Sequence, residues 1–585
     1  MLYFKDTNYK GEKTMKKYFK KLLATALVVI MTMTAFTVST SAWFDDAFPF
    51  DFVTKDGVSY LIETETMTAS VTGYEIDEEG NTDVPAELVI PSEIEYNGKN
   101  YPVRIVSDYA FADCPTLRKI TLPETIEYMG SYAFENSAYL ETVIIPETIE
   151  FTEFGSNVFD YTPAMGYLAE NTEDGAVILG QNVLFAYIGN ADTYVVPDEI
   201  DTIAENCFFL SGVREIILNS NITEIRPYTF ASCRNLKEIT IPEQVMYIGP
   251  NAFSNCTSLE KITLSDSLQS IGEKAFEGTA IKEIYLGDSI FNIMGAFAGC
   301  ETIEKITVSE NNKDYFTDGN ALFFRSYDYD GEEIVHTDEL YLEYFIINSD
   351  LTSYTVPSDV VFIGDYAFYN NKNLDEVNIT SPVYVGICSF AYCEFESFDF
   401  SNVTEINHSA FKGCRNLTSA DLSNTEYIYD SAFENCTSLA DVTFGENLGV
   451  IGSRAFANTA VASLDIGGDT NEIYEGAFVN CPELTRVNFN NGVSFIDSLM
   501  FTNCPKLDRV YIGEDIEYIA DNAFDTCPDN TVFEVIKHSN GCDHVEENGL
   551  NYEIVGKVSF FKRVVNFFTD LFERVRDFFL SWIIY

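Results

Sequence analysis

Basic residues are scarce in this chain of 585 residues. Lysine and arginine together number 35, against 92 aspartates and glutamates, which gives a formal net charge of -57 at pH 7. A nucleic-acid-binding surface needs clustered lysine and arginine to displace counterions from phosphates. The composition therefore excludes nucleic acid as a partner and favours basic or cationic partners.

Histidine is rarer still, with four residues at positions 336, 408, 538 and 544. None of them lies beside a Gly-x-Ser-x-Gly nucleophile motif or a cysteine in the setting of a nucleophile. The chain also lacks a glycine-rich phosphate loop between a strand and a helix, and it lacks the tight Cys-x-x-Cys spacing of common metal sites. We therefore expect no enzyme activity and no cofactor.

An aromatic residue recurs sixteen times in the same setting, usually as Ala-Phe, at a spacing of 21 to 23 residues in most repeats. A fixed period of about 20 to 50 residues indicates stacked structural modules. Because so short a module cannot bury its own apolar edge, its neighbours must cover it. The period predicts an α/β-type repeat solenoid dominated by short β-strands, with one continuous core. The recurring residues are Phe111, Phe134, Phe159, Phe208, Phe230, Phe253, Phe276, Phe297, Phe368, Phe390, Phe411, Phe433, Phe456, Phe478, Phe501 and Phe524.

One repeat, from Ile248 to Leu264, contains nearly the whole pattern Ile-Gly-x-x-Ala-Phe-x-x-Cys-x-x-Leu-x-x-Ile-x-Leu-Pro. This pattern resembles the BspA-like, or Treponema-type, leucine-rich repeat, and the resemblance covers about residues 104 to 530. It implies a leucine-rich-repeat array with a β cap at its N-terminus. It also implies a secreted or cell-surface protein of the kind found in bacteria and some protists, several of which are adhesins for host matrix proteins.

The repeats have boundaries that can be read along the chain. Residues 43–103 lack the period but alternate apolar and polar side chains, which predicts an N-terminal β cap. The repeats then span 104–535, and 536–556 forms the end of the array or a linker. Two stretches, near 160–200 and 310–356, interrupt the period with aromatic segments and a glycine turn. We interpret each as an enlarged repeat with a projecting β-hairpin.

Thirteen cysteines are present, and ten of them lie three residues after a recurring phenylalanine. Ser137, Thr279, Asn371 and Thr459 occupy the same position in other repeats. A slot that accepts these small residues indicates buried packing thiols rather than a disulfide framework, which would need dedicated pairs.

The first 42 residues have the features of a leader. Basic residues follow Met15, an apolar stretch runs from Leu22 to about Val38, and Thr-Ser-Ala ends at Ala42. This arrangement predicts a secretory signal peptide cleaved after Ala42, with Met15 as the natural start of translation. A retained membrane anchor is the alternative. The expected location is therefore secreted or cell-surface.

The C-terminal residues 557–585 differ from the repeats. Apolar side chains recur there at helical spacing, and five basic residues against three acidic ones give this segment a net charge of +2. An amphipathic helix of this kind suits an anionic membrane surface. A capping helix or a dimerising helix is the alternative. The expected membrane contacts are Phe561, Val564, Phe568, Phe572, Val575, Phe579 and Trp582, with Lys562 and Arg563 beside them.

Binding residues are expected on the strand of each repeat, where columns of side chains run across neighbouring strands. In the later repeats these columns become acidic, and we predict a ligand-binding patch on the concave face. Such a patch would bind a cationic group, a basic partner segment, or Ca²⁺ that bridges to a glycan. The alternative is a solvated acidic face. The predicted residues are Asp399, Asp421, Asp441, Asp465, Ser397, Ser419, Thr443 and Ser463.

These observations favour a non-catalytic module that binds a protein or glycan, with host matrix among the expected ligands. The alternative is a structural or assembly component of the cell envelope, in which the tail mediates self-association.

Overall fold

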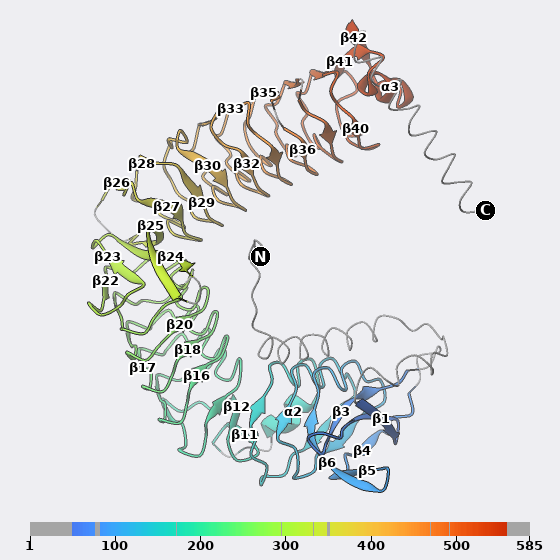
Figure 1. The fold of residues 1–585 in the computed structure, drawn as a ribbon, viewed down its shortest axis with the longest axis vertical. Helices are drawn as coiled ribbons and strands as arrows, with labels where there is room; N and C mark the ends of the chain where they lie inside the picture. Colours follow the sequence, from blue (N-terminus) through green and yellow to red (C-terminus); the bar gives the residue numbers. More distant parts are fainter. Residues whose placement is uncertain are drawn as a thin grey trace, which may run out of the picture.

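The computed structural model describes residues 50–557 except 77–81, 171, 173, 294, 331–332, 348–350, 469 and 491. Over these residues the chain is a solenoid of short strands that curves into an open arc (Figure 1). The predicted fold class, a leucine-rich-repeat solenoid, is confirmed. The predicted signal peptide and most of the tail lie outside the described residues. No helix in the described part of the chain is long and apolar enough to cross a membrane.

Each regular repeat contributes a longer strand and then a short one. The longer strands, which we call the outer strands, lie along the convex edge of the arc, as β17, β22, β33 and β35 show in Figure 1. They are β4 (Glu87–Val89), β7 (Lys119–Thr121), β9 (Thr142–Ile144), β13 (Thr193–Val195), β15 (Glu215–Ile217), β17 (Glu238–Thr240), β19 (Lys261–Thr263), β21 (Glu283–Leu286), β22 (Lys305–Val308), β26 (Ser353–Val356), β28 (Glu376–Ile379), β31 (Ser419–Leu422), β33 (Asp441–Phe444), β35 (Ser463–Ile466), β37 (Arg486–Phe489), β39 (Arg509–Ile512) and β41 (Val532–Lys537).

The short strands, which we call the inner strands, lie toward the centre of the arc, as β16, β18, β32 and β36 show in Figure 1. They are β8 (Tyr128–Met129), β10 (Glu153–Phe154), β14 (Thr202–Ile203), β16 (Glu224–Ile225), β18 (Tyr247–Ile248), β20 (Ser270–Ile271), β27 (Val360–Ile363), β29 (Val383–Val385), β30 (Val403–Ile406), β32 (Tyr427–Ile428), β34 (Val450–Ile451), β36 (Glu472–Ile473), β38 (Phe495–Ile496) and β40 (Tyr518–Ile519).

The N-terminal segment that we expect to form a cap contains strands that extend both faces of the arc. The meander β1 (Phe50–Lys55), β2 (Val58–Glu63) and β3 (Thr68–Tyr74) is antiparallel, and β3 then pairs with β6 (Lys99–Val106) in parallel. Strand β5 (Glu93–Tyr96) forms a hairpin with β6, which continues to β8. The cap therefore covers the first repeat through main-chain pairing.

Both interruptions of the period contain a β-hairpin. The first holds β11 (Ala176–Leu179) and β12 (Val183–Tyr187), preceded by a short helix, α2 (Ala164–Glu170), that the sequence pattern did not indicate. The second holds β23 (Tyr315–Thr317), β24 (Ala321–Asp330) and β25 (Glu333–Phe345). Strands β12 and β25 each pair in parallel with the next inner strand, so the hairpins are built into the inner side of the solenoid.

Segment 536–556, which we expected to end the array, contains a helix and a strand. Helix α3 (Asn540–Glu547) begins after Ser539, whose side chain accepts a hydrogen bond from the Cys542 amide. Strand β42 (Tyr552–Lys557) then pairs with β41 and extends the outer sheet by one strand. The segment is therefore an ordered part of the solenoid end and not a linker.

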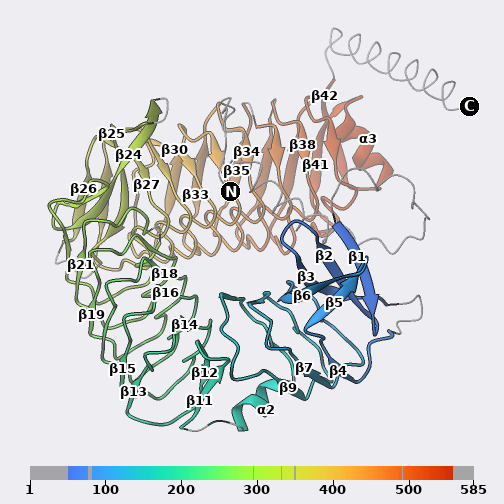
Figure 2. The same cartoon turned by 60° about the horizontal axis from the view of Figure 1, so that its bottom comes forward.

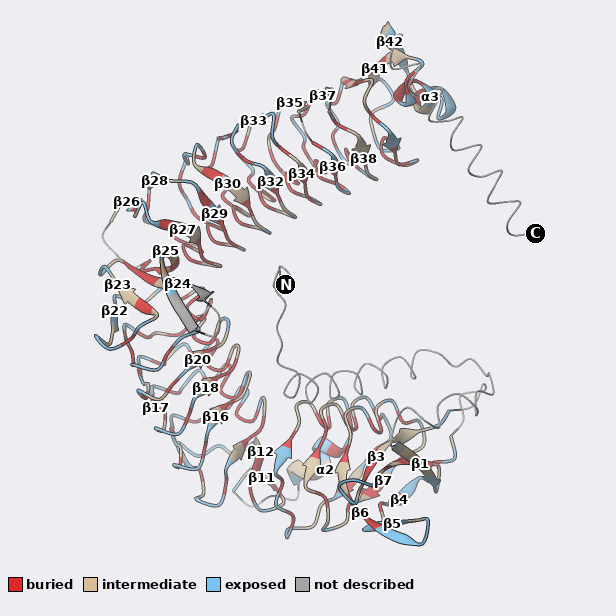
Figure 3. Ribbon diagram, viewed as in Figure 1, coloured by how far each residue is buried: buried red, intermediate tan, exposed pale blue. Residues whose placement is uncertain are grey.

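Buried residues run along the inside of every coil (Figure 3). Phenylalanine rings of successive repeats stack on one another; Phe411 and Phe433, for example, have centroids 5.3 Å apart. The core is nevertheless divided into three clusters, which meet at the two enlarged repeats. Adjacent residues of β25 separate two of them, because Tyr344 packs on Phe297 and Phe345 packs on Phe368. The expectation of one continuous core is therefore wrong, since alternate side chains of one strand point to opposite sides.

Main-chain pairing differs between the two faces of the C-terminal arm, whose strands lie side by side in Figure 2. On the inner side, one sheet of 11 strands runs from β23 to β40. Over the same repeats, the outer strands are divided among the groups β26-β28, β31-β33 and β35-β37-β39-β41-β42. Paired strands must stay about 4.8 Å apart. In this arm the inner strands keep this pairing without a break, whereas the outer strands do not.

Candidate binding faces

The loop that carries each recurring phenylalanine has an unusual backbone. Around every recurring phenylalanine except Phe524, the residues two positions before and two positions after the ring have positive φ, as at Ser431 (57°) and Asn435 (65°) around Phe433. Asparagine tolerates this left-handed conformation better than most residues. The two left-handed residues turn the chain sharply on both sides of the ring and direct it into the core.

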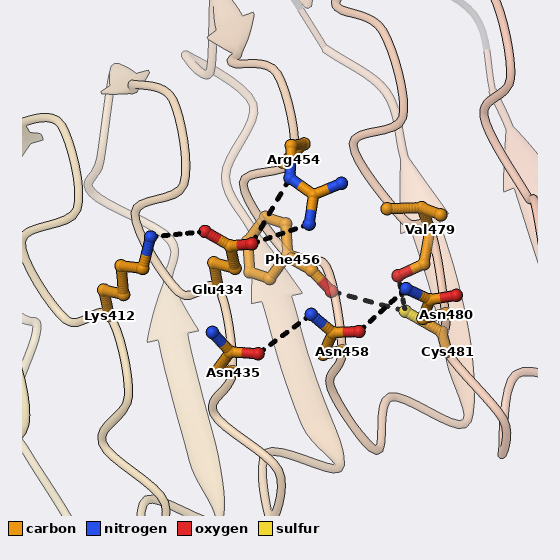
Figure 4. Close-up of polar contacts among 9 residues, drawn as sticks. All are labelled: Lys412, Glu434, Asn435, Arg454, Phe456, Asn458, Val479, Asn480 and Cys481. Atoms are coloured by element: carbon orange, nitrogen blue, oxygen red, sulfur yellow. Dashed lines mark hydrogen bonds and ion pairs between the residues drawn. The ribbon is translucent and has the colours of Figure 1, made fainter.

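Asparagines at the second left-handed position form a ladder across four repeats, part of which is drawn in Figure 4. The Asn458 side-chain amide donates to Asn435 Oδ1 at 2.9 Å, and Asn480 donates to Asn458 at 2.8 Å. Asn503 continues the series by donating to Asn480 at 2.8 Å. These amides are mutually satisfied, so the ladder is a structural feature that fixes the spacing of the repeats.

The cysteines have a structural role that matches the expectation of packing thiols. Typically the thiol donates a hydrogen bond to the carbonyl of the preceding recurring phenylalanine, as from Cys436 to Phe411 at 3.0 Å and from Cys481 to Phe456 at 3.3 Å (Figure 4). All thirteen cysteines lie in the described residues as free thiols. Burial raises the pKa of Cys393 to about 12, which keeps that thiol protonated and unreactive at neutral pH.

The predicted acidic patch lies on the outer face, so its assignment to the concave face is wrong. Strands β33 and β35 follow the convex edge of the arc in Figure 1, and β31 pairs with β33. The error arose because the sequence shows which strand carries the column but not the direction in which the solenoid bends. All eight predicted residues are exposed, and Ser397 and Asp399 lie outside any strand.

Three carboxylates of this patch accept hydrogen bonds from neighbouring groups. Asp399 Oδ1 accepts a hydrogen bond from the Ser401 amide at 2.9 Å, and Asp421 Oδ1 accepts one from the Ser423 amide at 3.2 Å. Asp465 accepts a hydrogen bond from the Asn488 side chain.

The strand register also separates like charges, because Asp421 lies opposite Thr443 and Asp441 lies opposite Ser419. Asp399 lies outside any strand, so it does not pair with Asp421 in a ladder. No group of three or more histidine, cysteine, aspartate or glutamate side chains in the described residues is arranged to hold a metal ion.

The concave face carries a different column, which sequence reasoning missed. In each inner strand the residue before the last buried side chain is exposed or half-buried, and the strand register aligns these residues from one repeat to the next. We call this set the inner column, and in the C-terminal arm it combines aromatic rings with two carboxylates. Its members are Tyr341, Phe362, Tyr384, Glu405, Tyr427, Val450, Glu472, Phe495 and Tyr518.

Several rings of the inner column are unusually exposed. Tyr384 is 48% exposed and Tyr518 is 52% exposed, and Phe495 stacks on Tyr518 with centroids 4.9 Å apart. Burial and the neighbouring Glu426 charge raise the pKa of Glu405. The sequence signal for this column was the residue before the recurring isoleucine or valine that ends each inner strand, as in Tyr247-Ile248-Gly249.

Cations near these repeats are already engaged by protein carboxylates. The side chain of Glu434 is nearly buried and accepts from Lys412 and Arg454, each at 2.7 Å (Figure 4). Burial opposes ionisation of Glu434, but the two cations outweigh it and lower the pKa of this carboxyl. The single negative charge of Glu434 offsets one of the two positive charges, so this group of three side chains keeps a net charge of +1.

The chain matches the family model described as the BspA type leucine rich repeat region, in 6 copies over residues 93–169, 179–304, 341–428 and 404–531. No curated protein is significantly similar to the chain in sequence.

Solved structures of bacterial leucine-rich-repeat proteins resemble the chain at low identity. A leucine rich cell surface protein from Faecalibacterium prausnitzii is 21% identical, with 85% of this chain and 97% of that chain covered and a TM-score of 0.32. The pneumococcal vaccine antigen PcpA is 17% identical, with 87% and 99% covered and a TM-score of 0.36. A leucine-rich repeat protein from Eubacterium ventriosum is 22% identical, with 60% and 90% covered and a TM-score of 0.41.

Proposed function

The chain belongs to the BspA-type leucine-rich-repeat family, and from that premise we propose that it is a secreted or cell-surface bacterial protein with a non-catalytic binding role. The observation that carries this proposal is the inner column, an aligned row of exposed and half-buried aromatic rings and carboxylates on the concave face. Exposed aromatic side chains at regular spacing are costly in water unless they serve a contact. The proposed ligand is a protein or a glycan, with host matrix among the candidates.

The chemistry of the inner column suits such ligands. A tyrosine ring attracts a lysine or arginine side chain through its face, and a neighbouring carboxylate such as Glu405 or Glu472 adds an ion pair. Sugar rings pack on the same aromatic faces. The net charge of -57 favours a basic protein surface as the approaching partner.

The acidic patch on the outer face remains a second proposed contact for a cationic group or for Ca²⁺. Its support is the exposure of Asp441 and Asp421 on adjacent paired strands. A solvated acidic face is the alternative, so the experiment must separate the two faces.

The full chain and two variants would be tested against an array of matrix proteins and glycans, with and without Ca²⁺. The inner variant replaces Tyr384, Tyr427 and Tyr518 with alanine, and the outer variant replaces Asp399, Asp421, Asp441 and Asp465 with asparagine. We expect saturable binding that the inner variant loses and the outer variant retains. Loss in the outer variant alone would move the site to the acidic patch, and no binding by the unmodified chain would contradict the proposal.

Export by the signal peptide within residues 1–42 and membrane contact by residues 557–585 belong to the same proposal. N-terminal mapping of the secreted protein should find a chain that begins after Ala42. Vesicles containing anionic lipid should bind the full chain, and deletion of 557–585 should abolish that binding. Equal binding to neutral vesicles would contradict the electrostatic part of the tail proposal.

A structural or assembly role is the second candidate, and strand β42 favours it. Strand β42 lies at the end of the outer sheet and buries neither side: Ile554 is 49% exposed and Val555 is 50% exposed. An exposed apolar edge strand tends to pair with another chain. Sedimentation of the full chain at rising concentration should then reveal assembly that is lost when Ile554 and Val555 are replaced by lysine and threonine.

A further inference from the structure

The outer sheet of the N-terminal arm opens between β15 and β17. These strands pair only through Glu215 and Glu238, whereas β13 with β15, and β17 with β19, pair over three residues each. Just after the neighbouring strands, an amide donates to the next repeat, from Val196 to Ile217 and from Ile241 to Thr263, both at 2.9 Å.

The corresponding bond across the opening is missing. Within the part of the chain that the structure describes, no hydrogen bond joins the Leu218 amide to the Thr240 carbonyl. The β15 side of the opening therefore presents a main-chain donor, the Leu218 amide, and the β17 side presents a main-chain acceptor, the Thr240 carbonyl.

A cavity of about 500 Å³ lies at this opening. Its size falls within the range of about 300 to 1,000 Å³ that is usual for ligand sites. Ile217, which is 47% exposed, and Pro242 give it apolar walls, but none of its lining residues is aromatic. The absence of aromatic lining argues against a sugar and leaves main-chain pairing as the specific feature of the site.

Three carboxylates line this cleft, those of Glu215, Glu238 and Glu243. Thr193 donates to Glu215 at 3.0 Å, and Ser267 donates to Glu243 at 2.7 Å, so hydroxyl groups orient two of them without neutralising their charge. Lys261 lies 3.9 Å from Glu238, and both side chains are exposed, so screening by water weakens this pair. The cleft is thus negatively charged.

We propose that this cleft binds an extended polypeptide segment of a partner protein that carries basic side chains. The main chain of the segment pairs with the Leu218 amide and the Thr240 carbonyl, as in recognition by strand addition. Its basic side chains face the three glutamates, and its apolar side chains contact Ile217 and Pro242. The site lies on the outer face, and it does not depend on the inner column.

The test uses the full chain and a fluorescent hexapeptide of alternating lysine and valine, followed by anisotropy. Thr240→Trp would fill the cleft, and Thr263→Trp is the matched control, because Thr263 is the exposed register partner of Thr240 and does not line the cleft. We expect saturable binding that Thr240→Trp weakens by about tenfold or more and Thr263→Trp leaves unchanged. Equal affinity in both variants would overturn the proposal.

Charge and main-chain pairing are tested separately. Glu243→Gln should weaken the peptide severalfold, whereas Glu124→Gln, which follows the equivalent proline in another repeat, should not. The same peptide with alternate amides methylated should not bind, and the unmodified peptide should slow hydrogen exchange over residues 215–244.

Three results would overturn the proposal. They are no saturable binding up to about 1 mM peptide, binding of the methylated peptide with unchanged affinity, or preference for a glutamate-valine peptide or an oligosaccharide. Thermal unfolding followed by circular dichroism would establish that each variant is folded.

Discussion

The inner and outer faces of the C-terminal arm come from the same repeats but differ in pairing and in chemistry. The inner strands form one sheet of 11 strands, and the outer strands over the same repeats form separate groups. Aromatic rings and two glutamates line the inner face, whereas aspartates, serines and threonines occupy the outer strands β31 to β35. The difference teaches that, in this arm, continuous pairing and a regular array of side chains lie on the concave side.

The largest effect is expected from a substitution of Phe433, which lies in the core that both faces share. Its loss should destabilise the inner and the outer face together. Its ring stacks on Phe411 at 5.3 Å and on Phe456 at 5.2 Å. Phe433→Ala should lower the free energy of unfolding of this region by about 3 to 5 kcal/mol. Denaturant unfolding with local hydrogen exchange would measure it. Faster exchange on one face only would contradict a shared core.

Glu343 on β25 adds a pH dependence where the long inner sheet begins. Burial and the charge of Asp365 raise the pKa of Glu343 to about 7. Since folding raises this pKa, the associated stability is full below about pH 4.5 and is lost as pH rises through 7. At pH 8, Glu343→Gln should therefore stabilise the chain by up to about 3 kcal/mol. Thermal unfolding from pH 5 to 8 would test this, and an unchanged pH dependence in the variant would contradict it.

Glu434 should show the opposite sign. Its pKa is lowered by Lys412 and Arg454 against the effect of burial, so its stability contribution is present above the unfolded pKa and is lost as pH falls. Glu434→Gln should cost about 1 to 2 kcal/mol at neutral pH and less under acidic conditions. The exposed Glu426→Gln variant is the control for denaturant unfolding at both pH values. An equal loss at acidic pH would contradict the ion-pair account.

The comparison of pairing can be sharpened by native-state hydrogen exchange. Amides of the continuous inner strands β32, β34 and β36 should open with a free energy about 1 kcal/mol higher than those at the break between β33 and β35. The pair β35 and β37, which is intact on the outer face, is the internal control. Equal protection at the break and at the control would show that the interruption has no energetic consequence.

The smallest effects are expected for the exposed residues of both faces. Tyr427→Ala on the inner face and Asp441→Asn on the outer face should each change the free energy of unfolding by less than about 0.5 kcal/mol. Denaturant unfolding would check both variants. A larger loss for either would mean that its column stabilises the solenoid, which would weaken the case that it is kept for binding.

Much of the fold could be predicted because the same residue types recur at the same positions of each repeat, where they have the same surroundings. The fixed position of Phe433 and Cys436 relative to their strands predicted a solenoid with packing thiols, and both are confirmed. The short helix α2 and the strand β42 were not predicted. Helix α2 has only 7 residues, which is too short for a helical period to be recognised, and β42 has no alternation of buried and exposed side chains. The break between β15 and β17 also left no signal, since Ile217 and Thr240 fit the repeat pattern.

The sequence by itself determined the repeat, the inward phenylalanine and the acidic character, because these depend on the identity and spacing of residues within about 23 positions. Only the tertiary structure decided which face is concave. That choice depends on the small rotation between stacked coils, which accumulates over many repeats and is not encoded in any one of them. This rotation placed Asp421 and Asp441 on the convex side and aligned Tyr384, Tyr427 and Tyr518 on the concave side.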